Sequence, residues 1–252
     1  MSNRPAQLVS LIAALLLAPA AARAAPPRSA DTLHDLVDTT GCVVEGDVTS
    51  ITPIYDSWFG PRTVVAMNNV VARLGNCPAG PINLVFSGGP LPDGRVFMVP
   101  DLARFYRNSH YVVFLRNTDW HWSPVVFRHA YRVETVAGKQ VLIDQSGHAL
   151  QRLDFNGLIS GTTKLFETYD PAGDAFARPI AVAGVTAADV APAITLDLLV
   201  NRLSSYAAAE GLSFGGTVSL IPANTHAWNR IPAVAAPAAP SNPGCTNPLG
   251  CS

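Results

Sequence analysis

Aromatic side chains that could stack on a flat ligand are concentrated in two short segments of the chain. Residues 55–61 read Tyr-Asp-Ser-Trp-Phe-Gly-Pro, and residues 117–124 read Asn-Thr-Asp-Trp-His-Trp-Ser-Pro. Three of the four tryptophans lie in these two segments. Exposed loop aromatics offer faces for stacking on sugars or bases and are frequent binding anchors. The candidate ligand contacts are Tyr55, Trp58, Phe59, Trp120, His121 and Trp122.

A second interpretation of the same rings stays open. Tryptophans in loops often close the end of a hydrophobic core, so these side chains could be core plugs instead of ligand contacts. The two interpretations differ in one measurable property, because a plug is buried and a contact is exposed.

Histidine and aspartate residues around the second segment raise the alternative of metal chemistry. Asp119 and His121 are two residues apart, and His110 and His129 lie on either side of them. A zinc site needs three or four converging ligands, and the chain contains no His-Glu-x-x-His or comparable spacing. We therefore expect no metal or other cofactor, and keep a metal-dependent hydrolase that uses His121, Asp119 and His129 as an alternative.

Two motifs share letters with catalytic or phosphate-binding sites but occur in the wrong context. Residues 211–215 match Gly-x-Ser-x-Gly, but a nucleophile elbow needs a strand before the serine and a helix after it. Here the predicted helix precedes the serine. Residues 87–90 are glycine-rich but lack the lysine and the following helix of a phosphate loop. We expect no catalytic residue in either motif.

The beginning of the chain predicts export. Arg4 precedes an apolar run over residues 8–17, which is too short to span a bilayer, and Ala22-Arg23-Ala24 is a signal-peptide cleavage site. An uncleaved N-terminal anchor is the alternative. After cleavage the chain would begin at Ala25, with no later apolar run long enough for a membrane span. We expect a periplasmic or extracellular protein.

Four cysteines follow the predicted cleavage site, and an even number in an exported chain favours disulfides. Three pairings are possible. We prefer the two within one segment each, because the spacing contains no Cys-x-x-Cys zinc motif. The expected disulfides are Cys42–Cys77 and Cys245–Cys251.

Extended segments dominate the predicted structure. Apolar residues are 48% of the chain, which supplies a sizeable core and excludes a disordered protein. Short helices are predicted over 31–37 and, from the apolar spacing, over 102–108; one longer helix over 195–210 has Thr195 as its N-cap and Gly211 after its end. The expected strands cover residues 42–54, 62–74, 82–86, 95–99, 110–116, 125–135, 140–143 and 149–153.

The order of three strands, a short helix and two strands matches the OB-fold, a five-stranded Greek-key barrel. We therefore expect a mainly β protein with an OB-like barrel, extra hairpin strands and one packed C-terminal helix. The expected parts are a signal peptide (1–24), a lead-in segment (25–40), the barrel (41–160), a loop with the packed helix 195–210 (161–211) and a flexible Pro/Ala-rich tail (212–252).

Three stretches of the chain, residues 42–48, 70–75 and 110–115, resemble exported bacterial OB-fold barrels. These barrels are related to the netrin module and to the tissue inhibitors of metalloproteinases, and the resemblance covers roughly residues 40–135. The inhibitors present a mature N-terminal cysteine to the protease zinc. Here Cys42 lies seventeen residues after the predicted start at Ala25, so we expect no such activity.

The charge balance argues against nucleic acid as a partner. Residues 38–160 contain ten Lys or Arg and ten Asp or Glu, whereas phosphate binding favours an excess of basic residues. The sequence therefore predicts an exported, monomeric, non-catalytic binding or interaction module whose partner is an extracellular glycan or protein. A structural envelope protein is a further alternative.

Overall fold

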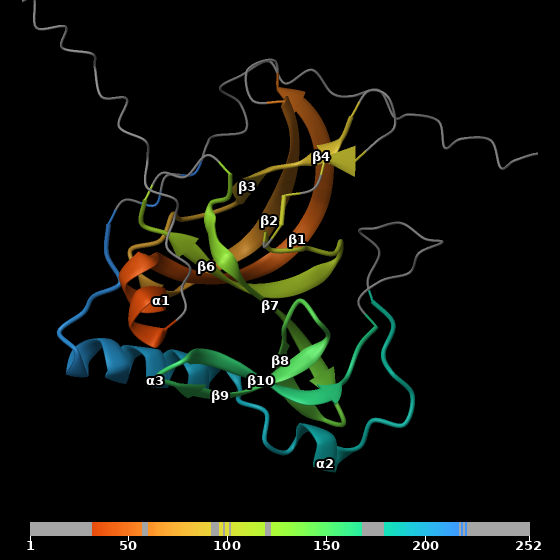
Figure 1. Cartoon of the computed structure of the whole chain (residues 1–252), viewed down its shortest axis with the longest axis vertical. Helices are drawn as coiled ribbons and strands as arrows, with labels where there is room; N and C mark the ends of the chain where they lie inside the picture. Colours follow the sequence, from red (N-terminus) through yellow and green to blue (C-terminus); the bar gives the residue numbers. More distant parts are fainter. Residues whose placement is uncertain are drawn as a thin grey trace, which may run out of the picture.

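An antiparallel sheet of eight strands dominates the computed structural model, which describes residues 32–56, 60–91, 96–97, 99–100, 102–118, 122–167, 179–216, 218 and 220. Its strand order is β10-β9-β8-β7-β6-β1-β2-β3, and the sheet bends into a half-barrel (Figure 1). The expected mainly β class is confirmed. The strands of the sheet are β1 (Thr40–Asp56), β2 (Gly60–Gly75), β3 (Ile82–Ser87), β6 (Ser109–Arg116), β7 (Val125–Val136), β8 (Lys139–Ile143), β9 (His148–Asp154) and β10 (Gly157–Lys164).

The long first strand, β1, connects the two halves of this sheet because it pairs with both β6 and β2. Its first half, residues 40–48, pairs with β6. Residues 42–56 pair with β2, whose residues 62–67 also pair with β3 on their other side. The register with β2 shifts between Glu45 and Asp47, around Gly46, as at a β-bulge. A Cβ on Gly46 would lie 2.9 Å from the Asn68 carbonyl oxygen, so only glycine allows this close approach.

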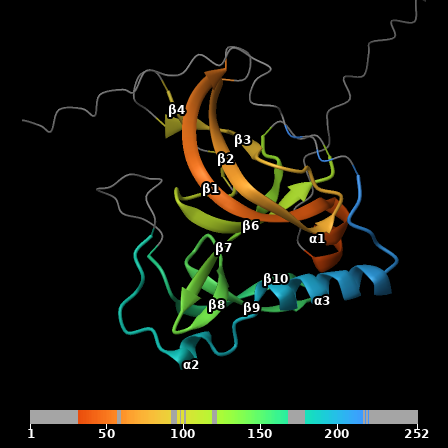
Figure 2. The same cartoon turned by 180° about the vertical axis from the view of Figure 1, so that it is seen from behind.

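The two faces of the sheet bury two separate clusters of apolar side chains. Alternation along β6 sends Val113 and Leu115 into an inner core, which also holds residues of β1, β2 and β3. Val112 and Phe114 point the other way, into an outer core. Helices α1 (Leu33–Thr39) and α3 (Leu196–Ala209) cover this outer face (Figure 2).

The predicted long helix is confirmed as α3. The Thr195 side chain caps it by accepting a hydrogen bond from the Leu198 amide at 3.3 Å, and Gly211 after its end has a φ of 65°. The expected apolar stripe packs on the outer core through Leu196, Leu199 and Leu203. The short N-terminal helix is also present, two residues later than predicted and capped by Thr32.

Two predicted segments differ from the observed structure. Residues 102–106 are irregular and lead into a turn, so the prediction of a helix there was wrong. Phe105 instead enters the inner core beside Phe86 and Tyr111, and the Tyr106 amide donates to the Tyr111 hydroxyl at 3.0 Å. The strand β10 was not among the expected strands. Its second half falls in the predicted loop-and-helix part 161–211 and exposes two threonines.

The remaining elements are short. A small two-stranded sheet is formed by β4 (Gly89–Pro90) and β5 (Val96–Phe97), and α2 (Ala187–Val190) packs near β8.

The predicted disulfide Cys42–Cys77 is present and links β1 to the segment after β2. Within the described residues, the helices are too short or too polar to cross a membrane.

Candidate binding site

The tip of the β1–β2 hairpin carries the first exposed aromatic residue. Tyr55 pairs with Pro61 across the hairpin and exposes 38% of its surface. The Pro61 carbonyl accepts a hydrogen bond from the Gly88 amide at 2.9 Å, which ties the tip to the segment after β3. Figure 1 shows β4, which follows this segment, beside the far part of the hairpin.

The loop between β6 and β7 reaches the same place. The Ser87 amide at the end of β3 donates to the Trp122 carbonyl at 2.8 Å, and Ser87 pairs with Arg62 of β2. The base of the loop is fixed, because the Arg116 amide donates to the Pro124 carbonyl at 2.9 Å. Trp122 exposes 36% of its surface. Two segments far apart in the sequence therefore meet at one rim of the half-barrel.

A third aromatic residue, which sequence reasoning missed, joins this rim. Phe97 of β5 pairs with Gly89 of β4 and exposes 43% of its surface. Gly88 and Gly89 both have positive φ angles, and a Cβ on Gly88 would lie 2.9 Å from the Phe97 carbonyl oxygen. The signal that could have found Phe97 is the Asp93-Gly94 turn, which predicts a hairpin around it. We call Tyr55, Phe97 and Trp122 the aromatic rim.

The exposed surface of the rim is uncharged where its side chains are described. The rim segments carry the guanidinium groups of Arg62 and Arg116, but these residues are only 1% and 4% exposed. Burial lowers the pKa of Arg116 to about 10, which still leaves it charged at neutral pH. Among the described side chains of these segments, the exposed ones are therefore aromatic or neutral.

The other predicted contacts lie outside the described residues. This applies to Trp58, Phe59, Trp120 and His121, and equally to Asp119 of the alternative hydrolase site. Trp58 and Phe59 belong to the short connection between β1 and β2, and residues 119–121 directly precede Trp122. Cys245, Cys251 and the predicted signal peptide are outside the described part as well.

His129, the third residue of the alternative hydrolase site, has surroundings that suit packing better than catalysis. Its Nδ1 lies 2.9 Å from the Tyr131 hydroxyl, and its ring lies 5.8 Å from that of Phe114. Burial, helped by the nearby positive charges of Arg128 and Arg116, lowers the pKa of His129 to about 4. Among the described residues, no three His, Cys, Asp or Glu side chains converge to hold a metal ion.

This low pKa predicts a pH-dependent stability. An unfolded chain protonates His129 below about pH 6.5, whereas the folded chain resists protonation until about pH 4. The contribution of His129 to the free energy of unfolding is therefore present above pH 6.5 and is lost as the pH falls toward 4. Urea titrations between pH 4 and 7 should show a smaller slope with pH in His129→Gln. Equal slopes in the wild type and in His129→Gln would contradict the assignment.

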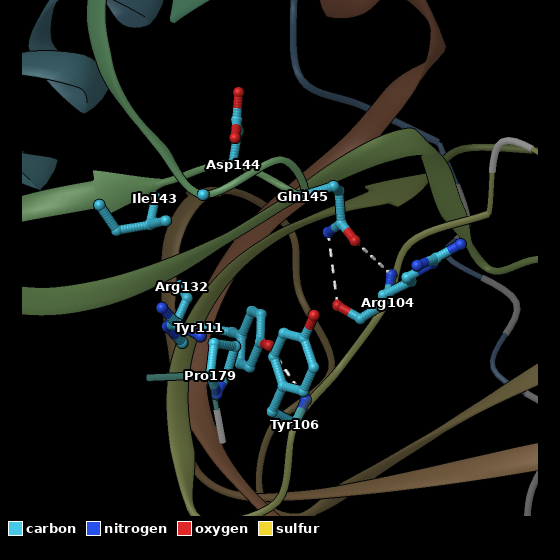
Figure 3. Close-up of a pocket in the computed structure, with 9 residues that line it drawn as sticks. Arg104, Tyr106, Tyr111, Arg132, Ile143, Asp144, Gln145 and Pro179 are labelled. Atoms are coloured by element: carbon cyan, nitrogen blue, oxygen red, sulfur yellow. Dashed lines mark hydrogen bonds between the residues drawn. The ribbon is translucent and has the colours of Figure 1, made fainter. Parts of the chain in front are cut away.

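A small cavity lies near the starts of β6 and β9, and Figure 3 shows its lining. Tyr106, Tyr111 and Arg132 form one side, and Gln145 forms the other. The volume of this cavity is about 10 Å³, which is room for one water molecule. Arg132 is already engaged, since its Nε lies 2.8 Å from a Glu134 carboxylate oxygen and its guanidinium lies 4.4 Å from the Phe166 ring centre. This cavity is a packing feature of the fold.

Comparisons with known proteins identify no relative. No family model matches the chain, and neither a curated protein nor a solved structure matches it. The function must therefore be inferred from the rim and its surroundings.

Proposed function

We propose that this protein is an exported, non-catalytic binding module that recognises a neutral extracellular glycan through the aromatic rim. The observation that carries the proposal is that the segments bearing the exposed residues Tyr55, Phe97 and Trp122 are joined at one rim of the half-barrel. Backbone hydrogen bonds from Ser87 and Gly88 bring their three segments together. A soluble protein gains nothing in stability from holding three large rings partly in water, and exposed apolar clusters mark interaction sites.

The strand order supports an OB-like barrel as the scaffold. If β1, β2, β3, β6 and β7 are strands one to five of such a Greek-key barrel, they lie side by side in the order three-two-one-four-five. In OB-folds, the loop between strands one and two and the loop between strands four and five flank the ligand. These loops correspond here to the β1–β2 and β6–β7 connections, which carry Tyr55 and Trp122.

The chemistry of the rim favours a neutral glycan over other ligands. Flat rings surrounded by neutral groups suit the apolar faces of sugars, whereas nucleic acid would require exposed basic side chains. A protein partner, which the sequence left open, becomes an outcome of the test.

Export rests on two supports. The predicted signal peptide directs the chain out of the cytoplasm, and the Cys42–Cys77 disulfide is the type of bond that persists in oxidising compartments. The alternative of a metal-dependent hydrolase loses support from His129, whose low pKa makes it a weak base at neutral pH. No described feature favours a purely structural envelope role.

The proposal is tested by measuring retention of the purified mature protein on insoluble neutral polysaccharides and on a glycan array. We expect binding that persists with a metal chelator and at high salt, because stacking on rings needs neither metal nor exposed charge. Loss of binding in chelator would instead favour the hydrolase alternative. Retention on no glycan, together with saturable capture of one envelope protein, would replace the glycan by a protein partner.

A further inference from the structure

A large open groove is lined by residues of α1, the β9–β10 turn and the C-terminal end of α3. Figure 2 shows these elements in the part of the molecule farthest from β4, beside which the aromatic rim lies. The volume of the groove is about 600 Å³. Typical ligand sites have volumes of about 300–1,000 Å³. Leu33, Leu153, Phe155 and Tyr206 form its apolar lining. We call this feature the acidic groove because of the charges described below.

Phe155 is the most conspicuous side chain of the acidic groove. It occupies a two-residue turn between β9 and β10, where small polar residues are usual, and it exposes 72% of its surface. The turn is held in place, because the Phe155 carbonyl accepts a hydrogen bond from the Leu33 amide at 3.0 Å. The Asn156 amide donates to an Asp154 carboxylate oxygen at 2.9 Å. A rigid backbone therefore presents an exposed aromatic ring beside an open groove.

Carboxylates surround this apolar lining. Asp35 comes from α1, Asp154 from the end of β9, and Glu210 from the end of α3. Arg152 offsets part of this charge, since its Nε lies 2.8 Å from a carboxylate oxygen of Asp154. The pKa of the Tyr206 phenol is raised by burial and then by the negative charges of Glu210 and Asp35, so both carboxylates act on the same part of the groove.

The arrangement distinguishes between possible cationic ligands. The described carboxylates and His34 do not converge closely enough to hold a metal ion. Separated carboxylates around an apolar floor instead suit a ligand with cationic groups on apolar stems. Lysine and arginine side chains have this character, and their cations also bind favourably over aromatic faces. Nucleic acid and anionic lipid are negatively charged, so the carboxylates of the groove would repel them.

We propose that the acidic groove binds an extended peptide segment of a partner protein, with a lysine or arginine near Glu210 and Asp35 and an apolar side chain against Phe155. This inference is independent of the proposed glycan site.

The test uses a fluorescent, capped tetrapeptide of alternating lysine and apolar residues, with a glutamate-containing peptide of the same apolar residues as its counterpart. Fluorescence anisotropy at low salt should show saturable binding of the lysine peptide to the intact mature protein and none of the glutamate peptide. Phe155→Ala should raise the Kd about 10-fold, as expected for loss of an aromatic contact. Glu210→Gln should raise it about 3-fold, in line with one partly exposed ion pair.

Two control variants change residues outside the acidic groove. Ile180→Ala removes an apolar side chain that is also 72% exposed but lies outside the groove, and Asp197→Asn removes a carboxylate at the other end of α3. Both should leave the Kd unchanged, as should Trp122→Ala in the aromatic rim. No binding by the wild type overturns the proposal, as does equal binding of both peptides. Binding that is insensitive to Phe155→Ala and Glu210→Gln, or spermidine binding as tightly as the peptide, also overturns it.

Discussion

Trp122→Ala is expected to weaken glycan binding about 30-fold while leaving the fold intact, because truncating an aromatic anchor costs about 2 kcal/mol of binding free energy. Tyr55→Ala and Phe97→Ala should each weaken it about 10-fold, since their rings offer a smaller stacking face than an indole. All three residues expose more than a third of their surface, so their removal opens no large internal cavity. Affinity electrophoresis or calorimetry on the retained glycan measures the Kd of each variant.

The control for these variants is an exposed apolar residue elsewhere on the same hairpin. Val71 of β2 is 47% exposed and lies near the opposite end of the strand from Pro61. Val71→Ala should bind glycan like the wild type. Thermal unfolding of every variant separates loss of contact from loss of fold. If Trp122→Ala binds normally, or if it binds less only because it unfolds, the rim is not the ligand site.

Removal of the disulfide is expected to produce the largest loss of stability. The cross-link closes a loop of 35 residues, which corresponds to about 4 kcal/mol of free energy of unfolding in the chain-entropy treatment. Cys42 is fully buried in the inner core, and the bridge anchors the segment after β2 to the start of β1. The double variant Cys42→Ala/Cys77→Ala should therefore unfold at a much lower urea concentration than the wild type.

Reduction of the wild type gives an independent version of the same measurement. A thiol reductant should lower the urea midpoint of the wild type toward that of the double variant, and should leave the double variant unaffected. A loss below about 1 kcal/mol would mean that the hairpin and the loop after it are held by packing alone.

Local patterns in the sequence predicted most of the elements that build the fold. The strands β1, β2 and β7 have long runs rich in β-branched and aromatic residues, and α3 has an apolar stripe with a clear N-cap at Thr195. The errors arose where tertiary contacts outweigh local propensity. Leu102, Phe105 and Tyr106 have helical spacing, yet no helix forms. The Phe105 ring packs against Tyr111, and the Tyr106 amide donates to the Tyr111 hydroxyl. The second half of β10 lacks apolar alternation and is a strand only because β9 pairs with it.

The candidate site, like the fold, has parts that local sequence predicted and parts that depend on tertiary contacts. Composition alone predicted the loops of Tyr55 and Trp122, because tryptophan-rich loops stand out in a sequence. Their meeting depends on hydrogen bonds from Ser87 and Gly88, which connect segments far apart in the chain and have no local signature. The Asp93-Gly94 sequence signals a hairpin near Phe97, but nothing local shows that its strand pairs with Gly89 and Pro90 at the rim. The acidic groove likewise combines three separate segments.

Hydroxyl-radical footprinting with and without the retained glycan tests most directly whether one ligand covers all three aromatic segments. Saturating glycan should lower the oxidation rates of Tyr55, Phe97 and Trp122 together, while Phe155 in the acidic groove keeps its rate. Protection of a single member of the rim, or of Phe155 in place of the rim, would contradict the account.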